Sequence, residues 1–332
     1  MNVLLTSVGR RVALLRAFRR ELEAFAPGGR VLAADASRLS AGFHDADEGF
    51  LVPACTTLEY VPALLEIVRR ERVKILIPLI DAELEVLARH RELFLREGCH
   101  AIVSDVDPVL VTRDKGRTVQ RFRELGFEAP RLFAPGELAD PESLPYPLFL
   151  KPVNGSSSIG AVRIGSPEEL RFFLERTNGP VVQSMESGEE YTVDVFADLD
   201  GLVCCAVPRQ RLETRAGEIS KGRTVKDRVI MDAAARLVEA LGGCRGCITV
   251  QCFRGPGERV VFFEANLRFG GGYPLSHAAG ANFPGWILRL VAGEKISTFD
   301  EWEDGLLMLR YDEGIFVRGN KRRDRPADGI LL

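Results

Sequence analysis

The first hundred residues alternate between short apolar runs and longer stretches in which apolar residues recur at helical spacing. The apolar runs, several of them rich in β-branched residues, predict strands over residues 2–7, 30–35, 75–79 and 100–104. The helical spacing predicts helices over residues 11–25, 58–70 and 82–95. Because strands and helices alternate, this part of the chain favours a parallel α/β sheet.

The second part of the chain has a different pattern, in which strands predominate. Helices are predicted over residues 115–125 and 168–176, and strands over residues 148–150, 161–164, 188–195, 247–253 and from Val260 onward. Prolines between residues 130 and 147 mark a long connection. The turn at residues 255–257 joins the last two predicted strands, so we expect these strands to pair.

Composition narrows the class of protein. The chain has 332 residues, of which 46% are hydrophobic and 27% charged, so a large core is available and disorder is not expected. At roughly 100–200 residues per domain, this length indicates two or three domains. A net charge of −3 calls for neither nucleic acid nor a membrane surface as a partner. The opening residues are too short for a signal peptide, and we expect a cytoplasmic protein.

The cysteines leave two interpretations open. The seven cysteines are an odd number, and several lie in apolar runs, which favours reduced and buried thiols. Cys244 and Cys247 have the C-x-x-C spacing of a zinc knuckle or a redox pair. A zinc site would need further Cys or His partners nearby, and none is evident in the sequence.

The strand that begins at Val260 carries the strongest chemical signal. Glu264, Asn266 and Arg268 follow at every second position, so they share one face of the strand. The acid and the amide offer oxygen ligands for a hard cation such as nucleotide-bound Mg²⁺, with a guanidinium beside them. Three glycines at 270–272 would let the backbone come close to a bound group. Gln251 lies among apolar residues of the neighbouring strand and needs a partner, which a cation or phosphate would supply.

Two further stretches favour phosphate and sugar binding. Lys151 precedes the loop 154–160, whose small residues and serines offer backbone N–H groups and hydroxyls to anionic oxygens. The lysine adds a positive point charge. Glu190 opens another strand, where a carboxylate can accept both hydroxyls of a ribose. The alternatives are a flexible hairpin and a strand with solvated acids.

The N-terminal part holds a weaker nucleotide signal. Gly9, followed by Asp35 at the end of the second strand, suggests a dinucleotide site, but the G-x-G-x-x-G pattern is incomplete. Ligands of open α/β sheets collect at the carboxyl ends of the strands. We therefore expect Arg10, which follows the first strand, to face a substrate.

These motifs follow one another in a characteristic order: Lys115, Lys151, loop 154–160, segment 183–190, Gln251, and the row Glu264, Asn266 and Arg268. In this order the chain resembles the ATP-grasp superfamily, and within it proteins similar to the large subunit of carbamoyl-phosphate synthetase. The N-terminal part resembles the pre-ATP-grasp domain of that family, with Asp81-Ala82-Glu83-Leu84 and Arg113-Asp114-Lys115 in characteristic places. The resemblance covers nearly the whole chain.

The resemblance implies a fold and a division into domains. The fold class is α/β, with a Rossmann-like, parallel-sheet pre-ATP-grasp domain over residues 1–112 and a two-subdomain ATP-grasp fold, α+β in character, over residues 113–295. The smaller subdomain, 113–186, would bear the lid over the phosphates, and the larger, 187–295, would bind the metal. Residues 296–332 would form a C-terminal extension.

The resemblance also implies a role for each matching residue. The residues expected to bind ATP are Lys115, Lys151, Ser156, Ser157, Ser158, Gln183, Ser184, Met185, Glu186 and Glu190. Gln183 and the backbone through Met185 would contact the adenine, and Glu190 the ribose.

Metal and catalytic residues are implied in the same way. Mg²⁺, with Mn²⁺ as the alternative ion, would be held by Gln251, Glu264 and Asn266. Many ATP-grasp enzymes have Glu where Gln251 stands, whereas carbamoyl-phosphate synthetase-like members have Gln. Arg268 and Lys151 would be catalytic, with Arg268 stabilising the phosphoryl group in transfer.

A basic stretch at 208–223 lies between two of these motifs. It lacks the interleaved aromatic residues of a nucleic-acid site. We interpret it as a loop that touches the phosphates and a carboxylate substrate, chiefly through Arg209, Arg211 and Lys221; a solvated basic loop is the alternative.

The leading functional hypothesis is an ATP- and Mg²⁺-dependent, carbamoyl-phosphate synthase-like ligase. It would activate a small-molecule carboxylate as an acyl phosphate for attack by an amine or related nucleophile. The chain departs from the large subunit in holding one ATP-grasp unit rather than two. A non-catalytic ATP-binding module of a larger assembly and an NAD-linked enzyme are the alternatives, and a homodimer stays open.

Overall fold

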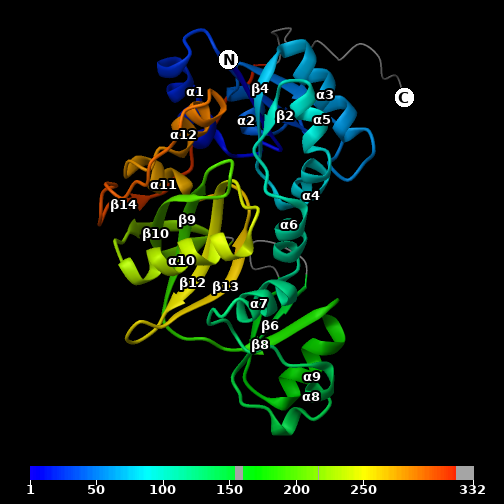
Figure 1. The fold of residues 1–332 in the computed structure, drawn as a ribbon. Helices are drawn as coiled ribbons and strands as arrows, with labels where there is room; N and C mark the ends of the chain where they lie inside the picture. Colours follow the sequence, from blue (N-terminus) through cyan, green and yellow to red (C-terminus); the bar gives the residue numbers. More distant parts are fainter. Residues whose placement is uncertain (154–159, 216, 319–332) are drawn as a thin grey trace. The chain divides into compact units, whose positions relative to one another are not determined.

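The computed structural model describes residues 1–153, 160–215 and 217–318 (Figure 1). The chain divides into two compact units: residues 1–102 with the segment from Tyr311 onward, and residues 103–310. The boundary expected after residue 112 falls inside helix α6 (Val106–Arg113) of the second unit. Strand β14 (Leu307–Leu309), in the expected C-terminal extension, is part of the second unit because it pairs with strand β11 (Glu218–Thr224).

The first unit contains the parallel sheet that the sequence predicts. Its strands run in the order β3-β2-β1-β4-β5. They are β1 (Asn2–Thr6), β2 (Arg30–Asp35), β3 (Glu48–Leu51), β4 (Val73–Pro78) and β5 (His100–Ala101). The helices are α1 (Val12–Phe25), α2 (Ala41–Asp45), α3 (Tyr60–Glu71), α4 (Asp81–Arg89) and α5 (Arg91–Arg96). The central strand β1 is buried from Val3 to Thr6, as expected of a strand covered on both faces.

The single helix predicted over residues 82–95 is wrong, because the structure has two helices separated by His90. The backbone N–H of His90 bonds to the carbonyl of Leu87 at 3.2 Å, which is a tighter turn than an α-helix makes. Its ring nitrogen Nδ1 lies 2.7 Å from the carbonyl oxygen of Val86. The hydrophobic spacing continues through this break, so periodicity alone could not reveal it.

Polar side chains near the carboxyl ends of β1, β2 and β4 form hydrogen bonds that stabilise the fold. The buried carboxylate of Glu83 accepts hydrogen bonds from the backbone N–H of Leu79 at 2.7 Å and from the hydroxyl of Ser7 at 2.9 Å. Burial raises the pKa of Glu83. Asp35 accepts from the N–H of Gly9, also at 2.9 Å, and so fixes the loop that follows β1. The sequence pair that suggested a dinucleotide site is thus a loop anchor.

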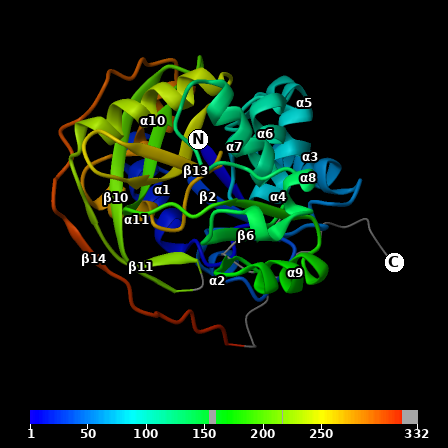
Figure 2. The ribbon, with the colours of Figure 1, turned by 90° about the horizontal axis from the view of Figure 1, so that it is seen from below.

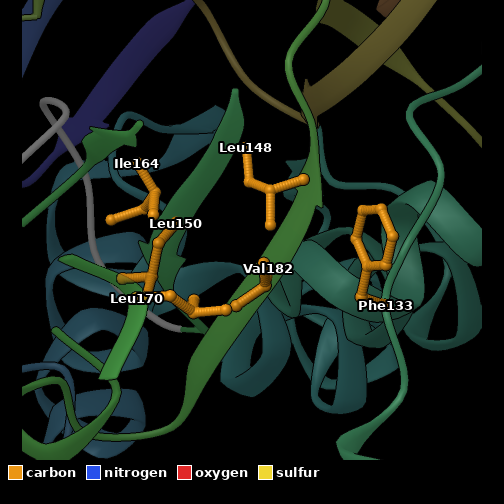
Figure 3. Packing of buried hydrophobic residues seen from close by; sticks show 6 residues of the cluster. All are labelled: Phe133, Leu148, Leu150, Ile164, Leu170 and Val182. Carbon is orange, nitrogen blue, oxygen red and sulfur yellow. The ribbon is translucent and has the colours of Figure 1, made fainter. Parts of the chain in front are cut away.

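The second unit contains a small antiparallel sheet with its own core. Its strands run in the order β7-β6-β8: β6 (Leu148–Pro152), β7 (Val162–Ile164) and β8 (Pro180–Ser184). The helices of this region are α7 (Lys115–Glu124), α8 (Pro135–Leu138), η1 (Pro141–Ser143) and α9 (Pro167–Arg176). Figure 3 shows the buried cluster formed by Phe133, Leu148, Leu150, Ile164, Leu170 and Val182. Leu148 and Leu150 face this core, so Phe149 and Lys151 face the opposite side of β6.

A six-stranded antiparallel sheet, here the large sheet, forms the rest of the second unit. Its order is β13-β12-β9-β10-β11-β14, with β9 (Glu189–Ala197), β10 (Val203–Arg215), β12 (Gly246–Arg254) and β13 (Val260–Asn266) besides β11 and β14. Helix α10 (Arg228–Leu241) packs against the sheet (Figure 2). Helices α11 (Tyr273–Ala278) and α12 (Phe283–Val291) follow β13 in the chain. The predicted pairing of β12 with β13 is confirmed.

The loop predicted over residues 208–223 is wrong, because this stretch forms most of β10 and β11. The two strands pair with Arg209 opposite Thr224 and Arg211 opposite Gly222. The polar composition concealed the strands because several of the polar side chains have partners in the sheet. Arg209, for example, pairs with Asp194, and Arg223 donates to Gln210 at 2.7 Å.

All seven cysteines are free thiols. Burial raises the pKa of Cys244 to about 12 and raises that of Cys247 as well. The part of the chain that the structure describes holds no group of three or more His, Cys, Asp and Glu side chains arranged to bind a metal ion. Within the same residues, no helix has the length and apolar character needed to cross a bilayer.

Candidate active site

A cavity of about 260 Å³ opens within the second unit. Most of its walls come from the small sheet and the large sheet. Its lining residues are Lys115, Phe149, Lys151, Ala161, Gln183, Met185, Glu186, Glu190, Arg211, Gly217, Gln251, Phe253, Phe263 and Glu264. Motifs that lie up to 149 residues apart in the chain therefore meet in one place.

The pairing of β12 with β13 builds the oxygen-rich wall. Gln251 lies opposite Glu264 in register, and Thr249 lies opposite Asn266. The Asn266 amide donates to Glu264 Oε1 at 2.9 Å, and the Arg268 guanidinium reaches Asn266 Oδ1 at 3.4 Å. The row predicted from alternate positions is therefore connected, although Arg268 lies beyond the end of β13.

The two lysines come from different elements. Lys115 is the first residue of α7, which Asp114 caps by accepting from the N–H of Arg117 at 2.9 Å. Lys151 lies on β6 and is 5% exposed. Burial lowers the pKa of Lys151 to about 8, Glu264 opposes this shift, and Lys115 adds to it. A bound anion would stabilise the charged form of this buried ammonium and offset its repulsion by the second lysine, so the two lysines favour anion binding.

Near the end of β8, the side chain of Gln183 has an acceptor oxygen to which no donor of the described residues bonds. Gln183 is 5% exposed, and its Oε1 is buried with no hydrogen-bond partner among the described residues. A buried amide oxygen of this kind is costly unless a ligand or water donates to it. Met185 and Glu186 line the cavity beside it. Ser184 does not line the cavity, and its hydroxyl donates to Glu186 at 2.7 Å.

Glu190 and Arg211 form an ion pair in the cavity wall. The distance between Arg211 Nε and Glu190 Oε1 is 3.0 Å. The same guanidinium donates to Thr192 Oγ1 at 3.3 Å and to the carbonyl of Gly217 at 3.1 Å. Burial raises the pKa of Glu190, Arg211 opposes this shift, and Glu264 adds to it.

The other expected substrate residues lie outside the cavity. Arg209 is buried in the large sheet and donates twice to Asp194, at 2.7 and 3.0 Å. Lys221 is exposed and pairs with Glu213 at 2.6 Å. Arg10 is an exposed residue of the first unit. Ser156, Ser157 and Ser158 lie outside the described residues.

At two positions, the glycines after β13 make room for protein atoms rather than for a ligand. A Cβ on Gly272 would lie 2.1 Å from Arg209 Nη1 and 2.5 Å from Ile219 Cγ2. A Cβ on Gly270 would lie 3.0 Å from Thr249 Oγ1. The glycine run therefore packs onto the buried arginine, contrary to the expectation that all three glycines serve a bound group.

Part of the cavity lining is apolar and was not predicted from the sequence. Phe253 and Phe263 stack with ring centroids 4.8 Å apart, and Phe149 lies on another wall. Alternation along the strands offered a signal for two of them. Phe149 is two residues from Lys151, and Phe253 is two residues from Gln251, so each shares a strand face with a predicted site residue.

Two family models match the chain. Residues 3–102 match the model described as PylC-like, N-terminal domain. Residues 180–313 match the model described as ATP-grasp in the biosynthetic pathway with Ter operon. The first match covers nearly all of the parallel sheet, and the second covers every strand of the large sheet.

Relatives with established names include ligases. The vancomycin B-type resistance protein VanB of Enterococcus faecalis is 24% identical over 248 residues, which is 66% of this chain and 72% of that protein. The D-alanine–D-alanine ligase of Corynebacterium jeikeium is 34% identical over 113 residues, 31% of this chain and 30% of the ligase.

Solved structures share the fold over most of the chain. The biotin carboxylase domain dimer of Hydrogenobacter thermophilus 2-oxoglutarate carboxylase, solved with MgADP and bicarbonate, has a TM-score of 0.73 at 14% identity, covering 92% of this chain and 73% of that one. The N5-carboxyaminoimidazole synthetase of Staphylococcus aureus, complexed with ADP, has a TM-score of 0.70 at 16% identity, covering 90% and 78%. With the order of its motifs, its fold and both family matches in agreement, the chain belongs to the ATP-grasp superfamily.

Proposed function

We propose that this chain is an ATP- and Mg²⁺-dependent ligase that activates a carboxylate as an acyl phosphate for attack by an amine or a related nucleophile. The observation that carries the proposal is the convergence in one cavity of two lysines, a buried amide acceptor, a carboxylate–arginine pair and an amide–carboxylate pair. In sequence order these residues are Lys115, Lys151, Gln183, Glu190, Arg211, Gln251 and Glu264.

The cavity offers a partner for each part of a nucleotide. Gln183 Oε1 lacks a donor among the described residues, and the 6-amino group of adenine would supply one. Glu190 offers carboxylate oxygens to the ribose hydroxyls. The ammonium groups of Lys115 and Lys151 would face the phosphates, where their mutual repulsion, part of the cause of the lowered pKa of Lys151, is relieved by negative charge.

The donor set also fits Mg²⁺. Mg²⁺ takes oxygen ligands and is usually held by one or two carboxylates together with phosphate oxygens. Gln251 and Glu264 face each other across β12 and β13 and both line the cavity. Asn266 orients Glu264 through a 2.9 Å hydrogen bond and would be the third ligand or its support. When bound, the ion neutralises phosphate charge.

The residues of the chain contribute position and charge to the two chemical steps. In the first, a carboxylate oxygen of the substrate attacks the γ-phosphorus of ATP, the bond to the β-phosphate oxygen breaks, and ADP leaves. In the second, the amine attacks the acyl carbon and phosphate leaves. Lys151 and Arg268 would stabilise the transferring phosphoryl group, and Arg268 is held by its bonds to Asn266 and to the carbonyl of Phe269.

The names of the relatives support a small carboxylate and a small amine as substrates. D-alanine–D-alanine ligase joins two such groups by name, and the synthetase and the biotin carboxylase domain share the fold. The carbamoyl-phosphate synthase-like subtype stays a prediction, since it depends on Gln251 and on the order of motifs in the sequence. Arg211 is the expected substrate residue that lines the cavity.

The test is turnover. The full chain is incubated with ATP, Mg²⁺ and a pooled set of amino acids, and phosphate release is measured with and without each amino acid. Release that depends on an added carboxylate supports the ligase. Tight ATP binding without release under any substrate would instead identify a non-catalytic nucleotide-binding module.

A matched pair of variants ties the activity to this cavity. Glu264→Gln removes one carboxylate and should lower turnover by about a hundredfold or more and weaken the dependence on Mg²⁺. Glu258→Gln makes the same chemical change on the exposed turn between β12 and β13 and should leave turnover unchanged. Full activity in Glu264→Gln would show that the metal assignment is wrong.

A further inference from the structure

The cross-strand pairing of β9 with β10 produces two acid–arginine pairs on one face of the large sheet. Glu190 and Asp194 lie four residues apart on β9, and Arg209 and Arg211 lie two residues apart on β10, so each set shares one side of its strand. Asp194 pairs with Arg209 in the core, whereas Glu190 pairs with Arg211 at the cavity. The Asp194–Arg209 pair therefore stabilises the core, whereas the Glu190–Arg211 pair lies where it can contact a bound ligand.

The Arg211 side chain is 9% exposed and lines the cavity. Nε lies 3.0 Å from Glu190 Oε1, Nη1 donates to Thr192 Oγ1, and Nη2 donates to the carbonyl of Gly217. Glu190 and Thr192 belong to β9, and Gly217 lies in the turn between β10 and β11. Two hydrogen bonds hold the guanidinium, and its buried Nε, which has no hydrogen-bond partner among the described residues, faces Glu190 as an ion pair. A guanidinium fixed in this way is a support for the carboxylate beside it.

The Glu190 side chain keeps access to the cavity, because it is 34% exposed while its Oε1 faces Arg211. The other charged groups that line the cavity are Lys115, Lys151, Glu186 and Glu264. Glu264, one of these four, acts against ionisation of Glu190, whereas Arg211 acts in its favour. Loss of Arg211 would therefore both free the carboxylate to turn and favour its protonated form.

We propose that Arg211 is a positioning residue that orients Glu190 toward the ribose hydroxyls, so that the sugar selectivity of the nucleotide site depends on the Arg211–Glu190 pair. The inference rests on the proposed function, in which Glu190 binds ribose. Arg211 does not contact the phosphates in this scheme. An ionised and oriented carboxylate accepts two hydroxyl hydrogen bonds, whereas a protonated or rotated one loses at least one of them.

The experiment compares four ligands with the full chain by calorimetry in Mg²⁺: ATP, 2′-deoxy-ATP, 3′-deoxy-ATP and inorganic tripolyphosphate. The wild-type chain should prefer ATP to the deoxynucleotides by about tenfold or more. Arg211→Gln should reduce this preference to the level of Glu190→Gln while leaving tripolyphosphate binding unchanged. The double variant should be no worse than either single variant, because both act on one interaction.

Two further readouts separate positioning from a general structural role. Arg211→Lys keeps the charge and should restore part of the selectivity. In Arg211→Gln, the rise of ATP affinity with pH on the acid side should move to higher pH, because the carboxylate then ionises later. Arg223→Gln, an exposed arginine on β11, is the matched control and should keep wild-type selectivity.

The outcomes that would overturn the inference are distinct from failure of the proposed function. If Arg211→Gln weakens ATP, the deoxynucleotides and tripolyphosphate equally, Arg211 contacts the phosphates and the inference is wrong while the nucleotide site stands. If the wild-type chain binds ATP without preferring it to the deoxynucleotides, Glu190 does not bind the ribose. If the wild-type chain binds none of the nucleotides, the proposed function fails and this inference with it.

Discussion

Arg209 and Asp194 form a fully buried ion pair in the large sheet, with side chains 1% and 0% exposed. Asp194 also accepts a hydrogen bond from Ser276 at 2.6 Å, so its two oxygens hold β9, β10 and α11 together. An arginine that looked from the sequence like a substrate contact is therefore part of the core. The pair, and the glycine run that packs on it, support the segment that carries Arg268.

Removal of the charge on Asp194 should destabilise the protein strongly. Asp194→Asn leaves the Arg209 guanidinium buried without a counter-ion, which costs about 3–5 kcal/mol of unfolding free energy. Ser276→Ala, a milder change in the same cluster, should cost about 1–3 kcal/mol. Urea unfolding followed by circular dichroism measures both.

The control for this prediction is Glu142→Gln. Glu142 pairs with Arg171 at 2.8 Å on the surface, where the side chains are 65% and 49% exposed. An exposed pair contributes about 0–1 kcal/mol, so this variant should unfold near the wild-type midpoint. Equal effects of the two acid-to-amide changes would contradict the role given to the buried pair.

Gly272 should not tolerate a side chain. In Gly272→Ala the new Cβ would lie 2.1 Å from Arg209 Nη1, so the guanidinium or the segment around Gly272 must shift. Because Arg268 lies in the same segment, we expect lower turnover together with a loss of about 1–3 kcal/mol of stability. Activity and thermal unfolding are measured on the same preparation.

Gly136→Ala provides the comparison for Gly272→Ala. Gly136 lies in α8, and a Cβ there would meet no atom within 4 Å. This variant should be neutral or slightly stabilised, since alanine restricts the unfolded chain. Wild-type activity and stability in Gly272→Ala would mean that the segment has more room than its packing indicates.

ATP affinity should fall as the pH rises through the pKa of Lys151, about 8. Phosphate binding favours the ammonium form, and above that pH the free protein has lost the proton, so each further pH unit weakens binding by up to about tenfold. Lys151→Arg should remove this step, because arginine stays protonated. Dissociation constants for ATP measured from about pH 7 to about pH 9 test the prediction.

Lys295→Arg makes the same substitution at an exposed position in the second unit and should keep the pH step. Loss of a proton from Glu190 favours its hydrogen bonds to the ribose, so Glu190 does not produce a fall in affinity toward alkaline pH. A flat profile in the wild-type chain would mean that Lys151 does not meet the phosphates.

Gln183 should contribute to base selectivity. Its buried Oε1 has no donor among the described residues, and we expect it to accept from the 6-amino group of adenine. The chain should therefore prefer ATP to inosine triphosphate, which lacks that group, by at least about tenfold, and Gln183→Met should remove the preference. Competition binding with the two nucleotides measures the ratio.

Gln120→Met serves as the control, because Gln120 is exposed on α7 and bonds to Glu124 at 3.0 Å. It should leave the ratio at the wild-type value. An unchanged ratio in Gln183→Met would assign base recognition to the backbone around Met185 instead.

The sequence predicts which residues lie next to one another on a strand or across a hairpin, because these relationships follow from the period of the strand. Alternate positions of a strand share a face, so Glu264 and Asn266 had to lie together, and the turn at 255–257 brought Gln251 opposite Glu264. The strand–helix alternation of the first hundred residues likewise required a parallel sheet. These features depend on the pattern within one strand, one hairpin or one strand–helix–strand unit.

Partners that lie far apart in the chain were decided by the tertiary structure. Arg209 and Arg211 are two residues apart on the same face of β10, and nothing local distinguishes them. Register against β9 places one beside Asp194 in the core and the other beside Glu190 at the cavity, because side-chain burial depends on what the sheet packs against. The break at His90 and the strands formed by residues 208–223 were hidden for the same reason: hydrogen bonds and ion pairs leave no period in the sequence.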